Sequence, residues 1–169
     1  RKHTLSFGTG LHNNFELNGR VSNIASDGYI DRASTNMFGY FFNANYVRET
    51  TLIKLLAFGG KEKTYQAWNG LEDPDKLKND RTFNSAGMYT DEFGTNQFYN
   101  NENDNYWQNH FQLHWSENWS ENWVSNIALH YTTGKGYFEQ YKEDQKFSSY
   151  NLPNFEGNSR TDLVRKRWL

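Results

Sequence analysis

Residues 105–131, NYWQNHFQLHWSENWSENWVSNIALHY, decide the fold, because apolar and polar side chains alternate twice within them. In the first half, the odd-numbered positions include Trp107, Phe111 and Trp115, and the even-numbered positions carry amide, imidazole and hydroxyl groups. Successive side chains of a strand point to opposite sides, so the pattern predicts a hairpin with one apolar and one hydrated face. Such a hairpin is typical of a wall between lipid and water.

We expect a three-residue loop at residues 118–120 to close this hairpin, because a loop of odd length keeps like faces together. This register sets Trp115 opposite Trp123 and Phe111 opposite Ile127. The apolar face then continues along the second strand, and Trp side chains mark the end of that face beside the turn.

The same alternation predicts further strands, at residues 2–11, 15–22, 36–46, 51–60 and 162–169. Short turns are expected at residues 12–14 and 47–50, whereas residues 26–35, 61–104 and 134–160 form longer polar connections. Short and long connections therefore alternate along the chain. Short turns on one rim and long loops on the other are typical of an outer-membrane barrel. We predict an all-β fold, an antiparallel transmembrane β-barrel segment that is part of a larger barrel.

The strand at residues 51–60 carries apolar side chains on both faces, so its orientation depends on its neighbour. A four-residue loop at 47–50 directs Ile53, Leu55 and Ala57 outward and Lys54 inward. The opposite choice would place Lys54 in lipid, at about 2–4 kcal/mol near the midplane.

Composition excludes several classes of protein. The net charge of −2 gives no electrostatic footprint for nucleic acid, and the absence of cysteine excludes disulfides and thiolate metal sites. No run of about 18 apolar residues exists, which excludes a transmembrane helix but not a membrane barrel. Aromatic residues make up 18% of the chain against 36% hydrophobic residues in all, a balance that suits strands and interfaces.

Several stretches together resemble the barrel of TonB-dependent outer-membrane receptors. They are FELNGRVS at 15–22, SDGYIDR at 26–32, AFGG at 57–60, EKTYQAWNG at 62–70, YTTGKGY at 131–137 and EQYK at 139–142. The resemblance extends over essentially the whole chain. It implies a 22-stranded barrel, closed by an N-terminal plug domain, that imports a siderophore, haem, cobalamin or a glycan with energy delivered by TonB.

On this resemblance, residues 1–169 are a fragment of the β-barrel domain with about six or seven strands, and the plug domain is not present in them. The implied partners are outer-membrane lipid, the receptor's own plug domain, TonB and a small nutrient ligand. The implied location is the outer membrane of a Gram-negative bacterium. We expect no enzyme activity, no cofactor and no nucleic-acid partner. The start at Arg1 and the end inside a strand pattern predict a piece of a larger protein.

Candidate ligand-binding residues lie in the predicted long loops: Tyr65, Trp68, Arg81, Tyr89, Tyr99 and Tyr137. Aromatic rings with an arginine could form a binding mouth, because rings offer apolar faces and polar tips. Equally, these rings could pack the loops against one another.

Candidate membrane-interface anchors lie at the ends of the strands beside the short turns: Phe15, Tyr46, Trp115, Trp119 and Trp123. Aromatic rings are enriched at the headgroup level of membrane proteins, so an interfacial girdle is the first interpretation. Stacking against sugars is the alternative.

No metal site is expected. Three imidazoles, of His110, His114 and His130, share the hydrated face and could ligate a metal, but no carboxylate completes the set, so we interpret them as polar wall residues. Loop carboxylates without a recognisable ligand spacing are interpreted as solvated charges: Glu62, Asp73, Asp75, Asp91, Glu92, Glu102 and Asp104.

Two other functions remain open. A secreted or surface β-sandwich could bind carbohydrate through exposed Trp and Tyr, provided that two apolar faces meet in a closed core. A porin-like passive channel would share the barrel but lack the plug domain and the segment that contacts TonB. The alternation of loop lengths and the scarcity of aliphatic residues favour a barrel over the sandwich.

Overall fold

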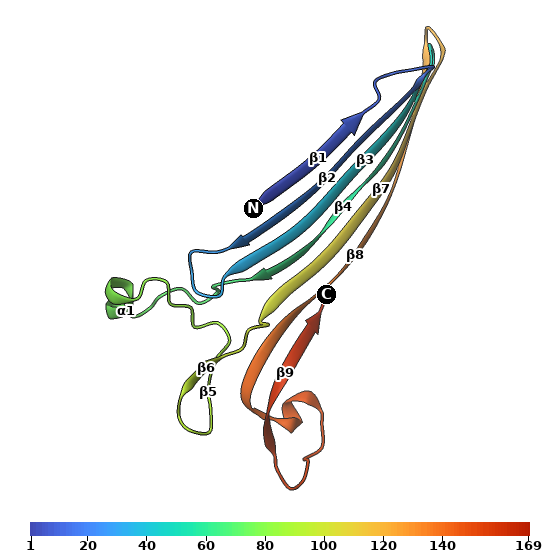
Figure 1. Cartoon of the computed structure of the whole chain (residues 1–169). Helices are drawn as coiled ribbons and strands as arrows, with labels where there is room; N and C mark the ends of the chain where they lie inside the picture. The colour runs from blue at the N-terminus through green and yellow to red at the C-terminus, as the bar shows by residue number, and fades with distance from the viewer. The chain divides into compact units, whose positions relative to one another are not determined.

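The computed structural model describes all residues from Arg1 to Leu169 and is mostly antiparallel β-structure, with 64% strand and 6% helix. The all-β prediction is therefore confirmed. Seven strands form one sheet in the order β1-β2-β3-β4-β7-β8-β9, and β5 and β6 form a separate hairpin (Figure 1). The sheet is not closed, because β1 and β9 each have only one neighbour.

The strands of the sheet are β1 Lys2–Gly8, β2 Phe15–Asp27, β3 Ser34–Val47, β4 Thr51–Tyr65, β7 Asn103–Ser120, β8 Trp123–Lys146 and β9 Arg160–Trp168. The small hairpin consists of β5 Met88–Thr90 and β6 Asn96–Phe98. Helix α1 spans Pro74–Asn79, and a 3₁₀ helix spans Phe147–Tyr150. Neither helix has the length and apolar character needed to cross a membrane.

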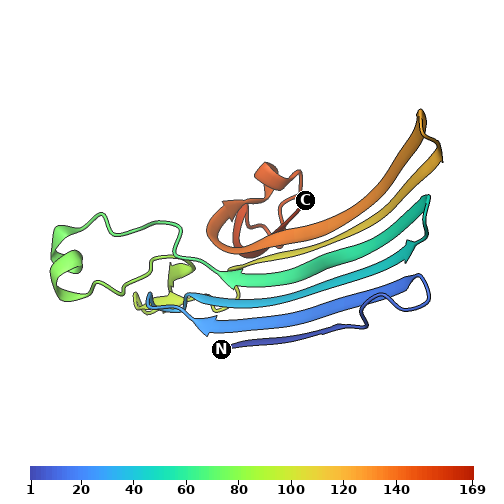
Figure 2. The ribbon, with the colours of Figure 1, turned by 90° about the horizontal axis from the view of Figure 1, so that it is seen from above.

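The chain divides into two compact units, which we describe separately. Unit 1 comprises Arg1–Ser26, Asn36–Glu62 and Tyr106–Lys135, and it contains most of each long strand together with the short turns. Its strands run side by side in both views (Figure 1 and Figure 2). Unit 2 comprises Asp27–Thr35, Lys63–Asn105 and Gly136–Leu169, which contain the longer connections, β5, β6 and β9.

Contacts in unit 1 confirm the two predicted faces. On the apolar face, Phe15 packs against Tyr46 with ring centroids 5.0 Å apart, and the rings of Phe111 and Tyr131 lie 6.5 Å apart. On the opposite, hydrated face, which we call the reverse face, the ring of His110 stacks on that of Phe58, with ring centroids 4.7 Å apart. Lys54 of β4 and His114 of β7 line one pocket, which places Lys54 on the reverse face with the polar side chains; the interior of a barrel is not tested by this open sheet.

The predicted hairpin register is wrong. Strand β7 continues to Ser120 and β8 begins at Trp123, so the turn lies at residues 121–122 instead of 118–120. Phe111 accordingly faces Tyr131 instead of Ile127. The polar residues before the turn stay in the strand because they find partners: the amide of Asn118 donates to the Thr50 carbonyl at 2.9 Å. The faces are unchanged, since Tyr131 and Ile127 are both odd-numbered.

Several predicted boundaries are also wrong, because strands continue through polar sequence. Strand β4 extends to Tyr65 and β8 extends to Lys146, so the loops predicted at 61–104 and 134–160 begin later. The first of these loops contains α1 and the β5-β6 hairpin instead of being structureless. Strand β1 ends at Gly8, before the predicted limit of 11, and β2 extends beyond 22 to Asp27. The short turn at 12–14 is present as predicted, and the turn predicted at 47–50 is one residue shorter, because β3 continues through Val47.

The sheet of unit 1 has no apolar core of its own. Buried hydrophobic residues are confined to Tyr65 and Ala86, both in unit 2. We call the exposed hydrophobic residues on one side of unit 1 the apolar face; it includes Leu5, Phe7, Phe15, Leu17, Phe38, Phe42, Leu55, Trp107, Phe111, Ile127, Leu129 and Tyr131. Phe111 is 45% exposed and Leu129 is 60% exposed, so neither side chain is covered by the protein itself.

Close approach of β4 to β7 requires a glycine at position 59. A Cβ atom there would clash with the carbonyl oxygen of Gln108 and would lie 2.9 Å from Oδ1 of Asn109. The vacant space is used by Tyr40 of β3, whose hydroxyl donates to Asn109 Oδ1 at 2.8 Å. Gly59 therefore lets a hydrogen bond link side chains on either side of β4.

We expect Gly59→Ala to destabilise unit 1 by about 1–2 kcal/mol, because the added methyl group meets backbone that cannot rotate away. Gly39→Ala is the matched control, since its Cβ would lie 3.3 Å from the Ser22 hydroxyl oxygen and at an ordinary contact distance of 3.8 Å from the Gly59 carbonyl oxygen. Urea unfolding of the two variants makes the comparison. Equal losses in both variants would contradict the role assigned to Gly59.

Candidate functional site

The loops of unit 2 are organised around the buried side chain of Tyr65, which is 3% exposed at the end of β4. Its hydroxyl lies 2.9 Å from the carbonyl oxygen of Ala86 and 3.0 Å from that of Tyr99, so its single proton is shared between the two acceptors. The backbone turns past it at Gly87, whose positive φ of 69° suits glycine. Tyr65 thus holds both ends of the segment that contains the β5-β6 hairpin.

Arg32 fixes the loop between β2 and β3 to the same segment. Its guanidinium lies 3.8 Å from the centre of the Phe98 ring and donates to the carbonyl oxygens of Asn84 and Ala86. Asn84 returns a hydrogen bond from Nδ2 to the Asp31 carbonyl at 3.0 Å. A planar cation that stacks and donates at once explains why an arginine occupies the end of the SDGYIDR stretch.

Glu139 of β8 is the most enclosed carboxylate of unit 2, with 3% of its surface exposed. Oε1 accepts hydrogen bonds from the Tyr99 hydroxyl and from Asn101 Nδ2, and Oε2 lies 3.2 Å from Nζ of Lys166. Burial alone would raise the pKa of Glu139, but these three partners outweigh it and hold the pKa below its ordinary value. The carboxylate therefore stays ionised and fastens the loop to β8.

An aromatic cluster lies beside this carboxylate. The ring of Tyr141 lies 4.4 Å from that of Tyr89 and 5.8 Å from that of Tyr99. Its hydroxyl donates to Asp162 Oδ2 at 2.8 Å. Burial, followed by this hydrogen bond to a carboxylate, raises the pKa of Tyr141 to about 12, so the phenol remains neutral.

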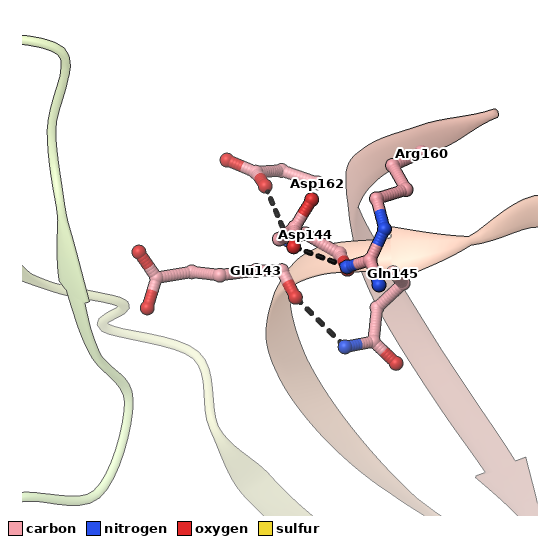
Figure 3. A network of polar contacts seen from close by, with 5 residues as sticks. All are labelled: Glu143, Asp144, Gln145, Arg160 and Asp162. Atoms are coloured by element: carbon pink, nitrogen blue, oxygen red, sulfur yellow. Dashed lines mark hydrogen bonds and ion pairs between the residues drawn. The ribbon is translucent and has the colours of Figure 1, made fainter. Parts of the chain in front are cut away.

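A β-bulge interrupts the pairing of β8 with β9 between Lys142 and Gln145, and polar contacts hold it in shape (Figure 3). Asp144 has a positive φ of 48°, and its amide donates to Asp162 Oδ1 at 2.8 Å. Arg160 pairs with the Asp144 carboxylate and donates to its backbone carbonyl oxygen. The bulge places one extra residue of β8 between two paired segments and bends the strand there.

A pocket of about 600 Å³ lies in unit 2, within the range of small-molecule sites. Its lining includes Trp68, Glu102, Phe138, Lys142, Arg165 and Arg167. Strand register explains part of the lining, because Phe138 pairs with Arg167 and Gln140 pairs with Arg165, which puts each pair on one face. Burial raises the pKa of Glu102, and attraction to Lys142 opposes that rise. The pocket thus combines aromatic surface with charges of both signs.

The structure separates the six candidate ligand-binding residues. Trp68 alone lines the pocket, with its ring perpendicular to that of Phe138 and centroids 5.4 Å apart. Tyr65, Tyr89 and Tyr99 pack the loops together, as the alternative interpretation proposed. The remaining two candidates lie elsewhere.

Arg81 is exposed and lies outside the pocket lining. Tyr137 belongs to β8 and not to a loop, and its ring packs against Trp168 at 4.8 Å. Tyr65 likewise belongs to β4. Both strands extend further than the alternation indicated, which is why the loop assignments of these two tyrosines are wrong.

Sequence reasoning missed the cationic side of the pocket. Arg165 and Arg167 are two residues apart on β9, so period-two counting along the last strand would have placed them on one face. Glu139 and Arg32 gave no comparable signal, because their importance depends on partners distant in the sequence.

The candidate interface anchors lie in unit 1, near its short turns. Trp119 and Trp123 flank the turn at 121–122, and both are largely exposed. The ring of Trp115 packs perpendicular to that of Trp119, with centroids 6.1 Å apart. Phe15 and Tyr46 contact each other beside the other two short turns. The anchors thus form pairs of rings at strand ends.

The histidines of the reverse face are engaged individually. His110 stacks on Phe58 and shares a hydrogen bond with Thr132 at 2.9 Å, and His114 contacts Gln112 at 3.2 Å. No group of three or more His, Cys, Asp or Glu side chains is arranged to hold a metal ion.

Comparisons with known proteins leave the family of the chain open. No family model matches the sequence, and neither a curated protein nor a solved structure matches the chain.

Proposed function

We propose that this chain forms part of the barrel wall of a TonB-dependent outer-membrane receptor, and that unit 2 forms ligand-binding loops outside the membrane. The observation that carries the proposal is the exposed apolar face of unit 1, opposite a face of hydrogen-bonded polar groups. Contiguous apolar surface of this kind needs a cover. Lipid would cover this surface and would also explain the aromatic side chains at the strand ends. A β-sandwich would need a second sheet over the same residues.

The length of the apolar face supports a membrane crossing. On β7 the face extends from Trp107 to Trp115, and on β3 it extends from Phe38 to Tyr46. A tilted strand needs about 9–11 residues to cross the hydrocarbon layer. Aromatic rings lie at both ends of these runs, as interfacial girdles require.

The lengths of the connections between strands support an orientation in which unit 2 lies outside the membrane. The connections after β3 and β7, at residues 48–50 and 121–122, are short, whereas those after β4 and β8, at residues 66–102 and 147–159, are long; the connections after β1 and β2 are equal in length, at residues 9–14 and 28–33. The connection after β4 contributes Trp68 to the pocket of unit 2. Outer-membrane barrels place short turns toward the periplasm and long loops toward the exterior. Import powered by TonB is supported by the sequence stretches that resemble these receptors.

Membrane fractionation tests the proposal. We expect the protein to sediment with outer membranes, to resist extraction by urea or alkaline carbonate, and to dissolve in detergent. A monomer that stays dispersed in buffer and melts cooperatively would refute the membrane location. Binding of the periplasmic domain of TonB by the detergent-purified, full-length receptor tests the transport step, and a porin-like channel would not bind it.

A further inference from the structure

The pocket of unit 2 has a wall of cations on β9. Arg165 and Arg167 both line it and are separated by roughly 7 Å along the strand, the repeat of two residues. Each guanidinium is a planar fork of donors that matches a carboxylate or another planar oxyanion. Lys142 of β8 adds a third cation to the lining.

The protein itself leaves these cations largely uncompensated. The ion pairs of the structure are Arg160 with Asp144 and Lys166 with Glu139, so neither pocket arginine takes part in one. Arg165 donates to the neutral amide oxygen of Gln140, which orients the guanidinium without neutralising it. The side-chain carboxylates of the lining, of Glu102 and Asp104, are fewer than its three side-chain cations, and Glu102 already faces Lys142.

Apolar surface lies beside the cations. Trp68 is 50% exposed, and Phe138 contacts it at a ring angle of 79°. This contact holds the indole in place while half of its surface remains open to a ligand. Because Phe138 pairs with Arg167 across the two strands, the ring and the guanidinium lie on the same face.

From these contacts we infer that the pocket binds a small organic anion that carries a flat apolar ring. Arg165 and Arg167 would bind its oxyanion, and Trp68 would contact its ring. The inference that the pocket binds such an anion depends only on the geometry of unit 2. That this ligand class is the nutrient selected for import rests on the proposed function.

A pair of probes that differ only in charge tests the inference. We expect 2-naphthoate to bind the purified protein, and 2-naphthamide, with the same ring but no charge, to bind at least about 10-fold more weakly. Isothermal titration in detergent, or in buffer if the protein is soluble, measures both affinities. Equal affinities for the two probes, or no binding of 2-naphthoate, would overturn the inference.

Variants assign the two parts of the pocket. Arg165→Gln and Arg167→Gln should each weaken 2-naphthoate about 10-fold and leave 2-naphthamide unchanged, whereas Trp68→Ala should weaken both probes. Lys78→Gln removes an exposed positive charge of α1 outside the pocket and should change neither affinity. Circular dichroism confirms that each variant is folded. An equal loss of 2-naphthoate affinity in Lys78→Gln would show that long-range attraction by positive charge, and not a specific site, binds the probe. This result would refute the assignment.

The result is independent of the membrane experiment. A protein that fractionates with outer membranes but does not discriminate the probes overturns the pocket and leaves the proposed function standing. A soluble protein that binds 2-naphthoate through Arg167 and Trp68 supports the pocket and overturns the proposed function.

Discussion

Phe111→Arg is expected to lower the free energy of unfolding by about 2–4 kcal/mol when the protein is folded in lipid vesicles. Phe111 lies midway along the apolar run of β7 between Trp107 and Trp115, and nearly half of its surface is uncovered by protein. If that surface contacts hydrocarbon, the guanidinium must be buried in lipid or pull water into the membrane. In an aqueous setting, a substitution at so exposed a position changes stability by only about 0.5 kcal/mol.

Two control variants isolate the charge from the ring. Gln112→Arg introduces the same side chain on the reverse face and should have almost no effect. Phe111→Leu removes the ring contact with Tyr131 without adding charge, and should cost no more than about 1 kcal/mol. Guanidinium unfolding of vesicle-embedded protein gives all three values. A Phe111→Arg loss no larger than that of Gln112→Arg would mean that the apolar face does not meet lipid.

The faces of unit 1 could be predicted because they depend on chain geometry alone. Every strand turns its side chains alternately, so Phe111 and His110 must lie on opposite sides whichever neighbour they meet. The same argument oriented Lys54 correctly once its hairpin with β3 was assumed. The register of β7 with β8 could not be obtained in this way. Loops centred on residue 119 and on 121 preserve the same faces, and the contacts of Phe111 with Tyr131 and of His110 with Thr132 agree with the second.

Unit 2 could not be predicted, because its order comes from contacts between distant residues. Tyr65 bonds to carbonyl oxygens more than twenty residues away, and Glu139 accepts a hydrogen bond from a tyrosine forty residues earlier. Neither residue is part of an alternating pattern that would mark it as important. From the sequence alone, both therefore resemble ordinary loop or strand residues. The pocket follows from that order, since Trp68 meets Phe138 only when the long connection folds back onto β8.

Glu139→Ala should release the segment at residues 87–102 from β8. The substitution leaves the Tyr99 hydroxyl and the Asn101 amide without their shared acceptor, and Lys166 without its counter-charge. Hydrogen bonds to a charged group contribute about 1.5–3 kcal/mol each, and part of this is recovered from water once the segment opens. We expect a net loss of about 2–3 kcal/mol in local stability, or hydrogen exchange roughly 30- to 150-fold faster across the segment. Glu92→Gln, an exposed carboxylate of the same loop, should change nothing.

Lowering the pH should also release the segment at residues 87–102 from β8, because the Glu139 carboxylate becomes protonated. The pKa of Glu139 in the folded protein lies below its ordinary value of 4.5, so the ionised form favours the docked segment. Its contribution is complete above pH 4.5 and is lost as the pH falls through the lower, folded value. Glu102, whose pKa is raised, acts in the opposite direction, so the comparison requires Glu139→Gln, which cannot ionise. Exchange measured between pH 6 and pH 3.5 should accelerate more in the native protein than in Glu139→Gln; equal acceleration would place the acid-sensitive contact elsewhere.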